Sequence, residues 1–328
     1  MPLFDPTPEN IALAAARLQS GELVAFPTET VYGLGASALD ADAVARIYAT
    51  KGRPSNNPLI VHVASPEDAR RLAARWPENA QKLAEAFWPG PLTLVVPKTS
   101  AVPGIISAGL GSVALRVPAH PVALELLRAA NLPLAAPSAN RSGEVSPSRA
   151  NHVLQSLGDS IWVLDGGPCE VGIESTVVDV TNDHAAILRP GTLSRRDIER
   201  VVGPLVEASD EPQGEGAPRR SPGTLEKHYA PRARVHLYST IIDAAFHAPL
   251  LASGQKIGVL TSEPTTLGRQ FDTIERVMPS DPAVYARELY NTLRDMDDAG
   301  VALILIESVP GGSAWEGVRD RLQRAAKR

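Results

Sequence analysis

Short apolar runs of strand length alternate with amphipathic helical patterns along most of this chain. The first helix is predicted to begin after Thr7, which can cap it, with Pro8 in its first turn and Gly21 at its end. A strand at residues 23–26 follows directly. This alternation is typical of βα units around a largely buried sheet, so we predict an α/β fold. Further strands are predicted at residues 58–63, 92–96, 113–117, 134–136, 161–164, 176–180 and 186–188.

Several of these strands follow one another in pairs, which departs from the strict alternation of strand and helix in a plain Rossmann fold. We therefore do not expect a plain Rossmann alternation in this part of the chain. A second helix is predicted to begin at Asp40 and to end at Gly52, because an acid or amide commonly caps a helix start and glycine commonly follows its end. This places Lys51 and Arg53 on either side of a helix terminus.

A polar segment from Val206 to Pro222 divides the chain. It has almost no apolar residue and is dense in Pro, Gly and charge, so we interpret it as part of a linker. Beyond it, strands at residues 235–238, 257–260 and 301–306 and a helix at 282–298 predict a small, Rossmann-like open α/β domain. The predicted divisions are an N-terminal domain over 1–205, a linker over 206–231 and a C-terminal domain over 232–328.

Charge and cysteine content exclude several classes of protein. The 328 residues include 32 Lys and Arg against 37 Asp and Glu, a net charge of -5, so the chain lacks the basic excess of a protein that binds mainly nucleic-acid phosphates. The single cysteine, Cys169, excludes an intramolecular disulfide and any multi-thiolate metal site, and it favours a reducing, cytoplasmic location. No signal peptide is recognised, and no uncharged apolar run approaches the roughly 18 residues of a membrane-spanning helix, so we expect no membrane association.

Two glycines after the strand at residues 23–26 suggest a ligand-binding turn. The segment from Gly33 to Ala38 also satisfies the loose dinucleotide pattern G-x-G-x-x-A, so an NAD enzyme has to be considered. Several residues separate the strand from these glycines, and no acid occurs between Ala43 and Pro66, where the ribose-binding carboxylate should lie. The context therefore argues against NAD.

Small hydroxyls, amides and isolated cations gather where several predicted strands end. Taken alone, Lys51 and Arg53 are most simply a solvated helix end whose cations offset the helix dipole. A buried arginine, by contrast, must be paired or must face a ligand, and Arg116 and Arg189 each lie within an apolar strand. Together these side chains indicate a pocket for a phosphorylated ligand. The sequence contains no P-loop pattern and no H-E-x-x-H, and no protein nucleophile is indicated.

Seven motifs in a fixed order carry a resemblance that spacing alone could not supply. They are PTETVYGLG, KGRPSNNPLIVH, WPGPLTLV, ALRVPAHP, APSAN, GIESTVVDV and LRPG. In this order they resemble the threonylcarbamoyl-adenylate synthase family, which is built on a YrdC-like domain, and the match covers nearly all of residues 10–200. The linker end SPGTLEKHYAP and the following hundred or so residues resemble the long form of that family. The resemblance implies a YrdC-like twisted mixed sheet with helices around a concave pocket.

The resemblance also implies a reaction: L-threonine, bicarbonate and ATP yield threonylcarbamoyl-AMP and pyrophosphate, for the modification of adenosine beside the tRNA anticodon. A separate transferase complex would use the product, and Mg²⁺ would accompany the ATP phosphates. Lys51 and Arg53 are implied as the catalytic residues, and no residue as a metal ligand. Threonine contacts are implied for Thr30, His62, Arg116, Ala136 and Ser175, and ATP contacts for Lys51, Arg53, Asn57, Ser112, Ser138, Asn140, Ser146 and Arg189.

Two alternatives stay open at this point. A YrdC-like domain resembles a locally basic RNA-binding surface, so the chain could be a non-catalytic RNA-binding module, or an enzyme with weak RNA affinity. The linker motifs Ser221–Gly223 and His228–Pro231 could merely dock the second domain, or the linker could close over the pocket as a lid. Leu225 and Glu226 differ from the aromatic or basic residues that the family often carries there. We expect a monomer.

Overall fold

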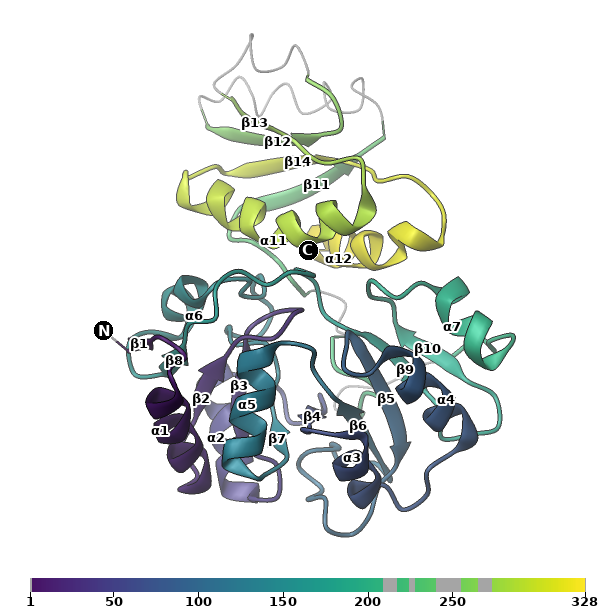
Figure 1. The fold of residues 1–328 in the computed structure, drawn as a ribbon. Helices are drawn as coiled ribbons and strands as arrows, with labels where there is room; N and C mark the ends of the chain where they lie inside the picture. Colours follow the sequence, from purple (N-terminus) through teal and green to yellow (C-terminus); the bar gives the residue numbers. More distant parts are fainter. Residues whose placement is uncertain (1, 209–216, 224–227, 240–254, 265–272, 328) are drawn as a thin grey trace.

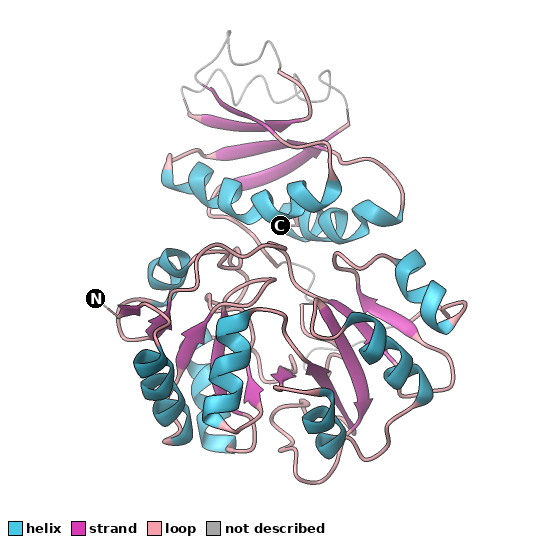
Figure 2. Ribbon diagram, in the orientation of Figure 1, coloured by secondary structure: helices cyan, strands magenta, loops and turns pink. Residues whose placement is uncertain are grey.

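A mixed ten-stranded sheet lies at the centre of the N-terminal part of the chain (Figures 1 and 2). The structure is a computed structural model, and it describes residues 2–208, 217–223, 228–239, 255–264 and 273–327. Parallel and antiparallel pairs both occur in the sheet, which confirms the predicted α/β class and mixed sheet. From edge to edge its strands are β1 (Leu3–Phe4), β8 (Trp162–Leu164), β2 (Val24–Phe26), β3 (Gly33–Ser37), β7 (Leu134–Ala135), β4 (Ile60–His62), β6 (Ser112–Arg116), β5 (Leu92–Pro97), β9 (Thr176–Asp179) and β10 (Ala186–Arg189).

The helices of this part begin and end where the sequence chemistry indicates. Thr7 caps the first helix by accepting a hydrogen bond from the Asn10 amide at 3.3 Å. Asp40 caps the second helix, and Gly52 ends it in the left-handed conformation, with φ of 60°, that glycine adopts without strain. The helices are α1 (Pro8–Gln19), α2 (Ala41–Lys51), α3 (Pro66–Leu72), α4 (Glu78–Phe87), α5 (Pro121–Ala130), α6 (Ala150–Leu157) and α7 (Arg195–Val202).

The two faces of the sheet are covered differently. Successive residues of a strand point to opposite faces, so Ala25 packs in a large cluster with α2, α3 and α4, whereas Val24 packs with α1 and α5. Ile60 and Ala114, side by side on β4 and β6, belong to a small cluster whose members all come from strands or their ends. This stretch of the sheet therefore has room for something other than a helix, and the candidate pocket lies there.

The segment Gly33–Ser37 corrects one sequence prediction. It forms strand β3, antiparallel to β2, rather than a turn. A side chain on Gly35 would overlap the ring of Phe26, and one on Gly33 would press on Ala136, so the two glycines serve close packing. The dinucleotide interpretation is excluded as well, because that motif requires a turn between a strand and a helix.

In the residues that the structure describes, the C-terminal part has a parallel four-stranded sheet with helices on the side that faces the N-terminal part (Figure 1). The open α/β sheet is as predicted, although one strand, residues 273–277, was not anticipated; the finer Rossmann-like description stays a prediction. None of the described helices is long and apolar enough to cross a membrane. In sheet order the strands are β11 (Arg234–Tyr238), β14 (Leu303–Glu307), β12 (Ile257–Thr261) and β13 (Thr273–Val277), and the helices are α11 (Pro282–Asp298), the short η1 (Ser313–Trp315) and α12 (Glu316–Ala326).

The two parts share one apolar cluster. Val145 and Ile173 of the N-terminal part pack with Leu289 and other residues of α11 and α12. The backbones also approach closely, because Gly317 on α12 faces the backbone of Gly191 with no space for a side chain between them. The C-terminal part is thus docked directly on the N-terminal part, while the exact domain boundaries at 205 and 231 stay predictions.

Replacing Gly317 by alanine should therefore destabilise the docked arrangement. Alanine favours a helix by about 1 kcal/mol over glycine, but overpacking against a rigid backbone costs about 1–3 kcal/mol, so we expect a net loss of stability. The measurement is the thermal melting temperature of the full chain. Gly311→Ala is the matched control, because a side chain there would meet nothing within 4 Å; equal melting temperatures for the two variants would contradict this account of the interface.

Candidate active site

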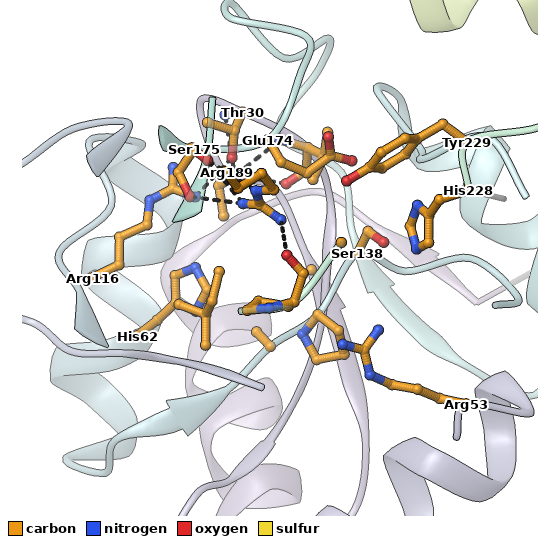
Figure 3. A pocket seen from close by; sticks show the side chains of 18 residues that line it. Thr30, Arg53, His62, Arg116, Ser138, Glu174, Ser175, Arg189, His228 and Tyr229 are labelled. Atoms are coloured by element: carbon orange, nitrogen blue, oxygen red, sulfur yellow. Dashed lines mark hydrogen bonds between the residues drawn. The ribbon is translucent and has the colours of Figure 1, made fainter. Parts of the chain in front are cut away.

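A cavity lies on the uncovered stretch of the sheet, where strands and loops of the N-terminal part meet the linker (Figure 3). Polar side chains from several elements point into it, and they come from segments far apart in the sequence. Its lining residues are Thr28, Thr30, Val31, Gly33, Arg53, Ile60, His62, Arg116, Ala136, Pro137, Ser138, Glu174, Ser175, Arg189, Pro222, Gly223, His228 and Tyr229.

Strand register places His62 beside Arg116. The parallel pair β4 and β6 aligns these two residues directly, so both side chains project from the same face at the same end of the sheet. Burial, and secondarily the charge of Arg116, lowers the pKa of His62 to about 3. The imidazole is therefore neutral at physiological pH and can act as a hydrogen-bonding group but not as a cation.

Arg116 is held from three sides. Its guanidinium forms an ion pair with Glu29 (Nη2 to Oε1, 2.7 Å) and donates to Thr30 Oγ1 at 2.9 Å and to the Gly90 carbonyl at 3.2 Å. Glu29 and Arg116 are both buried. An arginine within an apolar strand requires either a partner or a ligand, and the partner of Arg116 is Glu29, the third residue of the loop between β2 and β3.

Lys51 and Arg53, at the end of α2, donate to uncharged oxygen atoms. The Lys51 ammonium donates to the carbonyls of Ser138, at 2.6 Å, and of Asn140. Arg53 donates to the side-chain oxygen of Asn57 at 2.5 Å and to that residue's carbonyl at 3.1 Å. Burial lowers the pKa of Lys51 well below its usual range, with the charge of Arg53 adding to the effect, and lowers the pKa of Arg53 to about 10.

Arg189 joins the sheet to the linker. It donates to the carbonyl of Ser175 at 2.9 Å, to the hydroxyl of Ser175 at 3.2 Å and to the carbonyl of Pro222 at 3.1 Å. Within the described residues, Lys51, Arg53 and Arg189 form no ion pair, although all three are buried. All three basic side chains are hydrogen-bonded to uncharged oxygens and lack a directly paired carboxylate, so the site favours an anion.

Glu174 is a buried carboxylate on the wall of the cavity. Its Oε1 accepts from the Ser146 hydroxyl at 2.5 Å, and its Oε2 accepts from the Tyr290 hydroxyl at 2.9 Å and from Arg321 Nε at 2.7 Å. Burial alone would raise its pKa, but Arg321, Arg189 and the hydrogen bonds outweigh burial and hold that pKa at about 2. Glu174 is therefore ionised, and two of its partners belong to the C-terminal part.

Two described stretches of the linker form part of the cavity wall. Pro222, Gly223, His228 and Tyr229 line it, and Gly223 has φ of +82°, a conformation that places its Cα next to Tyr229 and Arg189. Whether the segment opens and closes as a lid stays a prediction. Leu225 and Glu226 lie outside the described residues.

The structure brings most of the residues implied by the family resemblance to one place. Ser112 is the exception, because it stands at the far end of β6, four residues and about 13 Å along the strand from Arg116. Glu29, Glu174 and Arg321 were not assigned from the sequence; a buried arginine that needed a partner was the available signal, and it did not say which acid. His228 and Tyr229 lie in the second linker motif, which the sequence singled out without giving either residue a role. Thr30, Arg53, His62, Arg116, Ala136, Ser138, Ser175 and Arg189 line the cavity, and Lys51, Asn57, Asn140 and Ser146 lie directly behind its lining.

Similarity to known proteins covers the whole chain. The Sua5/YciO/YrdC family model, described as "Telomere recombination", matches residues 16–191, and the model of the C-terminal domain of threonylcarbamoyl-AMP synthase matches residues 193–327. The threonylcarbamoyl-AMP synthase of Pyrococcus abyssi is 43% identical over 97% of this chain and 94% of its own length. The protein of that name from Bacillus subtilis is 42% identical over 97% of this chain and 93% of its own length.

Solved structures agree with these sequence matches. The crystal structure of P. abyssi Sua5 complexed with L-threonine superposes with a TM-score of 0.85 and 41% identity, covering 96% of this chain and 94% of that one. E. coli YciO, at 22% identity and a TM-score of 0.51, shares the fold over 58% of this chain and 93% of its own. The family models, the relatives and the fold all agree with the resemblance first seen in the motifs, and the chain belongs to the threonylcarbamoyl-AMP synthase family.

Proposed function

We propose that this chain converts L-threonine, bicarbonate and ATP into threonylcarbamoyl-AMP and pyrophosphate. The observation that carries the proposal is that two groups of basic side chains around one cavity differ in their partners. Within the described residues, Lys51, Arg53 and Arg189 donate to neutral oxygens and form no ion pair, which suits a triphosphate. Arg116 is already ion-paired with Glu29, which suits the smaller charge of an amino acid. The relatives of this name make the assignment specific.

The reaction balances without a protein nucleophile. The threonine amine combines with bicarbonate to give a carbamate and water, and a carbamate oxygen then attacks the α-phosphorus of ATP while the bond to pyrophosphate breaks. Negative charge builds on the α-phosphate and the leaving group. We expect Lys51 and Arg53 to offset this charge, because preorganised charge of this kind is the main contribution that proteins make to such transfers. The single thiol, Cys169, is buried outside the cavity lining and takes no part.

Threonine fits the end of the cavity formed by β4 and β6. Arg116 can grip a carboxylate in a bidentate way while Glu29 stays beside it, and Glu29 in turn attracts the α-ammonium group before the amine loses its proton. Thr30, Ser175 and the neutral imidazole of His62 supply further hydrogen-bonding groups, and Ala136 supplies an apolar contact. The related P. abyssi structure was solved with L-threonine, which supports this substrate.

Mg²⁺ fits the site as part of the nucleotide substrate rather than as a resident ion. Within the described residues, no three His, Cys, Asp or Glu side chains gather around one point. The carboxylate of Glu174 is already occupied by Ser146, Tyr290 and Arg321. The ATP phosphates would therefore hold the ion and most of its waters, which is the usual arrangement for this metal, and the ion would offset phosphate charge.

The wider role follows from the proposed product. Threonylcarbamoyl-AMP is an activated intermediate, so a downstream tRNA threonylcarbamoyl transferase complex would consume it. The cytoplasmic location, the monomeric state and any weak RNA affinity are part of the same proposal. A salt-sensitive affinity for RNA without pyrophosphate release would favour the RNA-binding module instead.

Pyrophosphate release tests the function directly. The purified chain is mixed with MgATP and bicarbonate and with each amino acid in turn, and we expect release with threonine well above the other amino acids. Lys51→Ala should remain folded and lose about 10²-fold or more in rate, because one preorganised charge at the transferring phosphate is removed. Lys82→Ala is the control, since Lys82 is paired on the surface with Glu78. Wild-type release by Lys51→Ala would overturn the role given to this lysine.

Arg116→Lys tests the threonine end of the cavity. Lysine keeps the charge but cannot form the guanidinium fork, so we expect threonine affinity to fall about tenfold or more while ATP affinity changes little. Both dissociation constants are measured by separate calorimetric titrations. Arg128→Lys, at an exposed position on α5, should change neither. Equal losses for threonine and ATP in Arg116→Lys would contradict the assignment.

The linker generates a further prediction. Because Pro222, Gly223, His228 and Tyr229 of the linker line the cavity, ATP and threonine together should slow proteolysis between Glu207 and Arg220. Truncation after Pro204 should yield less intact threonylcarbamoyl-AMP, since water then reaches the adenylate. Cleavage rates that do not respond to ligands, together with full product yield from the truncated chain, would show that the segment is only a tether.

A further inference from the structure

A charged side chain of the C-terminal part reaches the wall of the cavity. Arg321, on α12, is fully buried, and its Nε donates to Glu174 Oε2 at 2.7 Å. Its Nη1 donates to the carbonyl of Pro190 at 3.0 Å, and also to Asp320, its neighbour on the helix. Arg321 thus links α12 to the segments that carry Glu174 and the end of β10.

The same guanidinium lies against the linker. Its central carbon is 4.9 Å from the centre of the Tyr229 ring, within the range of a cation–π contact. Tyr229 in turn stacks on Tyr290 of α11, with ring centres 5.9 Å apart and planes inclined by 24°. The hydroxyl of Tyr290 donates to Glu174, which also binds Arg321. Arg321, Tyr290, Glu174 and Tyr229 therefore form one contiguous buried cluster, which we call the Arg321 cluster.

Fold stability alone is a weak reason for a buried arginine. Removing two ions from water costs about as much as their attraction returns, and an apolar pair of similar volume is often at least as stable. A buried ion pair does, however, fix geometry, because both partners lose most of their freedom. The position that Arg321 fixes is that of Glu174, whose other oxygen holds the hydroxyl of Ser146.

We propose that Arg321 is a positioning residue for nucleotide binding, so that the C-terminal part forms an integral element of the active site through the Arg321 cluster. This inference rests on the proposed function. It goes further by assigning a residue of the C-terminal part to one of the two substrates. The cluster meets the cavity at Glu174 and Tyr229, beside Ser146 and Arg189, which are candidates for ATP contacts.

Arg116, the proposed contact of the threonine carboxylate, is held by separate contacts, whereas Ser175, another candidate threonine contact, directly follows Glu174 and accepts from Arg189. Arg116 is fixed by Glu29, Thr30 and Gly90, and none of these three contacts a member of the Arg321 cluster in the hydrogen bonds and ion pairs of the described residues. A change at Arg321 should therefore alter the affinity for ATP and leave that for threonine nearly unchanged. A purely structural role would lower the melting temperature and either affect both substrates or affect neither.

Arg321→Lys in the full chain is the first test. Lysine keeps a positive charge for Glu174 but loses the plane that lies on Tyr229 and the fork that also reaches Pro190. We expect the dissociation constant for MgATP to rise about tenfold or more, as small misplacements of a site require, and that for threonine to stay within twofold. Arg319→Lys, on the same helix but hydrogen-bonded to carbonyls of Pro310 and Gly312, is the matched control and should change neither.

Tyr290→Phe is the second test and decides the matter if Arg321→Lys does not fold. It removes one hydroxyl that Glu174 binds and preserves the ring stack, and we expect MgATP affinity to fall about threefold or more. Unchanged MgATP affinity in these variants, or equal losses for both substrates, would overturn the inference. Binding measurements distinguish the failure of this inference from the failure of the proposed function. If the wild-type protein binds MgATP and threonine but releases no pyrophosphate, the proposed function is refuted, while the affinities of the variants still test the role of Arg321.

Discussion

The burial of five cations around one cavity is the constraint on which the rest of the structure depends. An unpaired buried charge costs more than the net stability of an ordinary domain can absorb, so each cation requires partners inside the protein. Two are compensated by carboxylates and three by uncharged oxygens, mostly backbone carbonyls. The unequal compensation leaves one region of the cavity more positive than the other, which matches a triphosphate beside an amino acid. The five are Lys51, Arg53, Arg116, Arg189 and Arg321.

The partners of these cations explain why segments distant in the chain meet here. Carbonyls in the loops after strands are not used in the hydrogen bonds of the sheet, so they can accept hydrogen bonds from these cations. The mixed sheet supplies such loops along one uncovered face, and the linker supplies another carbonyl at Pro222. Glu174 connects the cavity to the C-terminal part, because it forms an ion pair with Arg321. The site, the linker and the domain contact are therefore one connected set of interactions.

Most strands of this fold could be predicted from the sequence because they are short apolar runs bounded by turn residues, as at residues 92–97 and 257–261. Gly33 and Gly35 were misinterpreted because glycine disfavours strands on average, and only the packed structure shows that Phe26 occupies the space a side chain would need. Arg116 could be identified as needing a partner. Its partner Glu29 could not be named, because nothing in the spacing sets it apart from other acids.

The sequence by itself determined the class of fold, the family through its ordered motifs, and most of the residues around the cavity. Helix caps, strand patterns and polar residues at strand ends each depend on residues close together in the chain, so they can be recognised from the sequence. The tertiary structure alone decided which charges meet. Glu174 and Arg321 are separated by 147 positions in the chain, yet Oε2 of Glu174 lies 2.7 Å from Nε of Arg321. His62 lies beside Arg116 only because of the register of two parallel strands. Such pairings depend on how elements pack in space, and no local pattern in the chain encodes them.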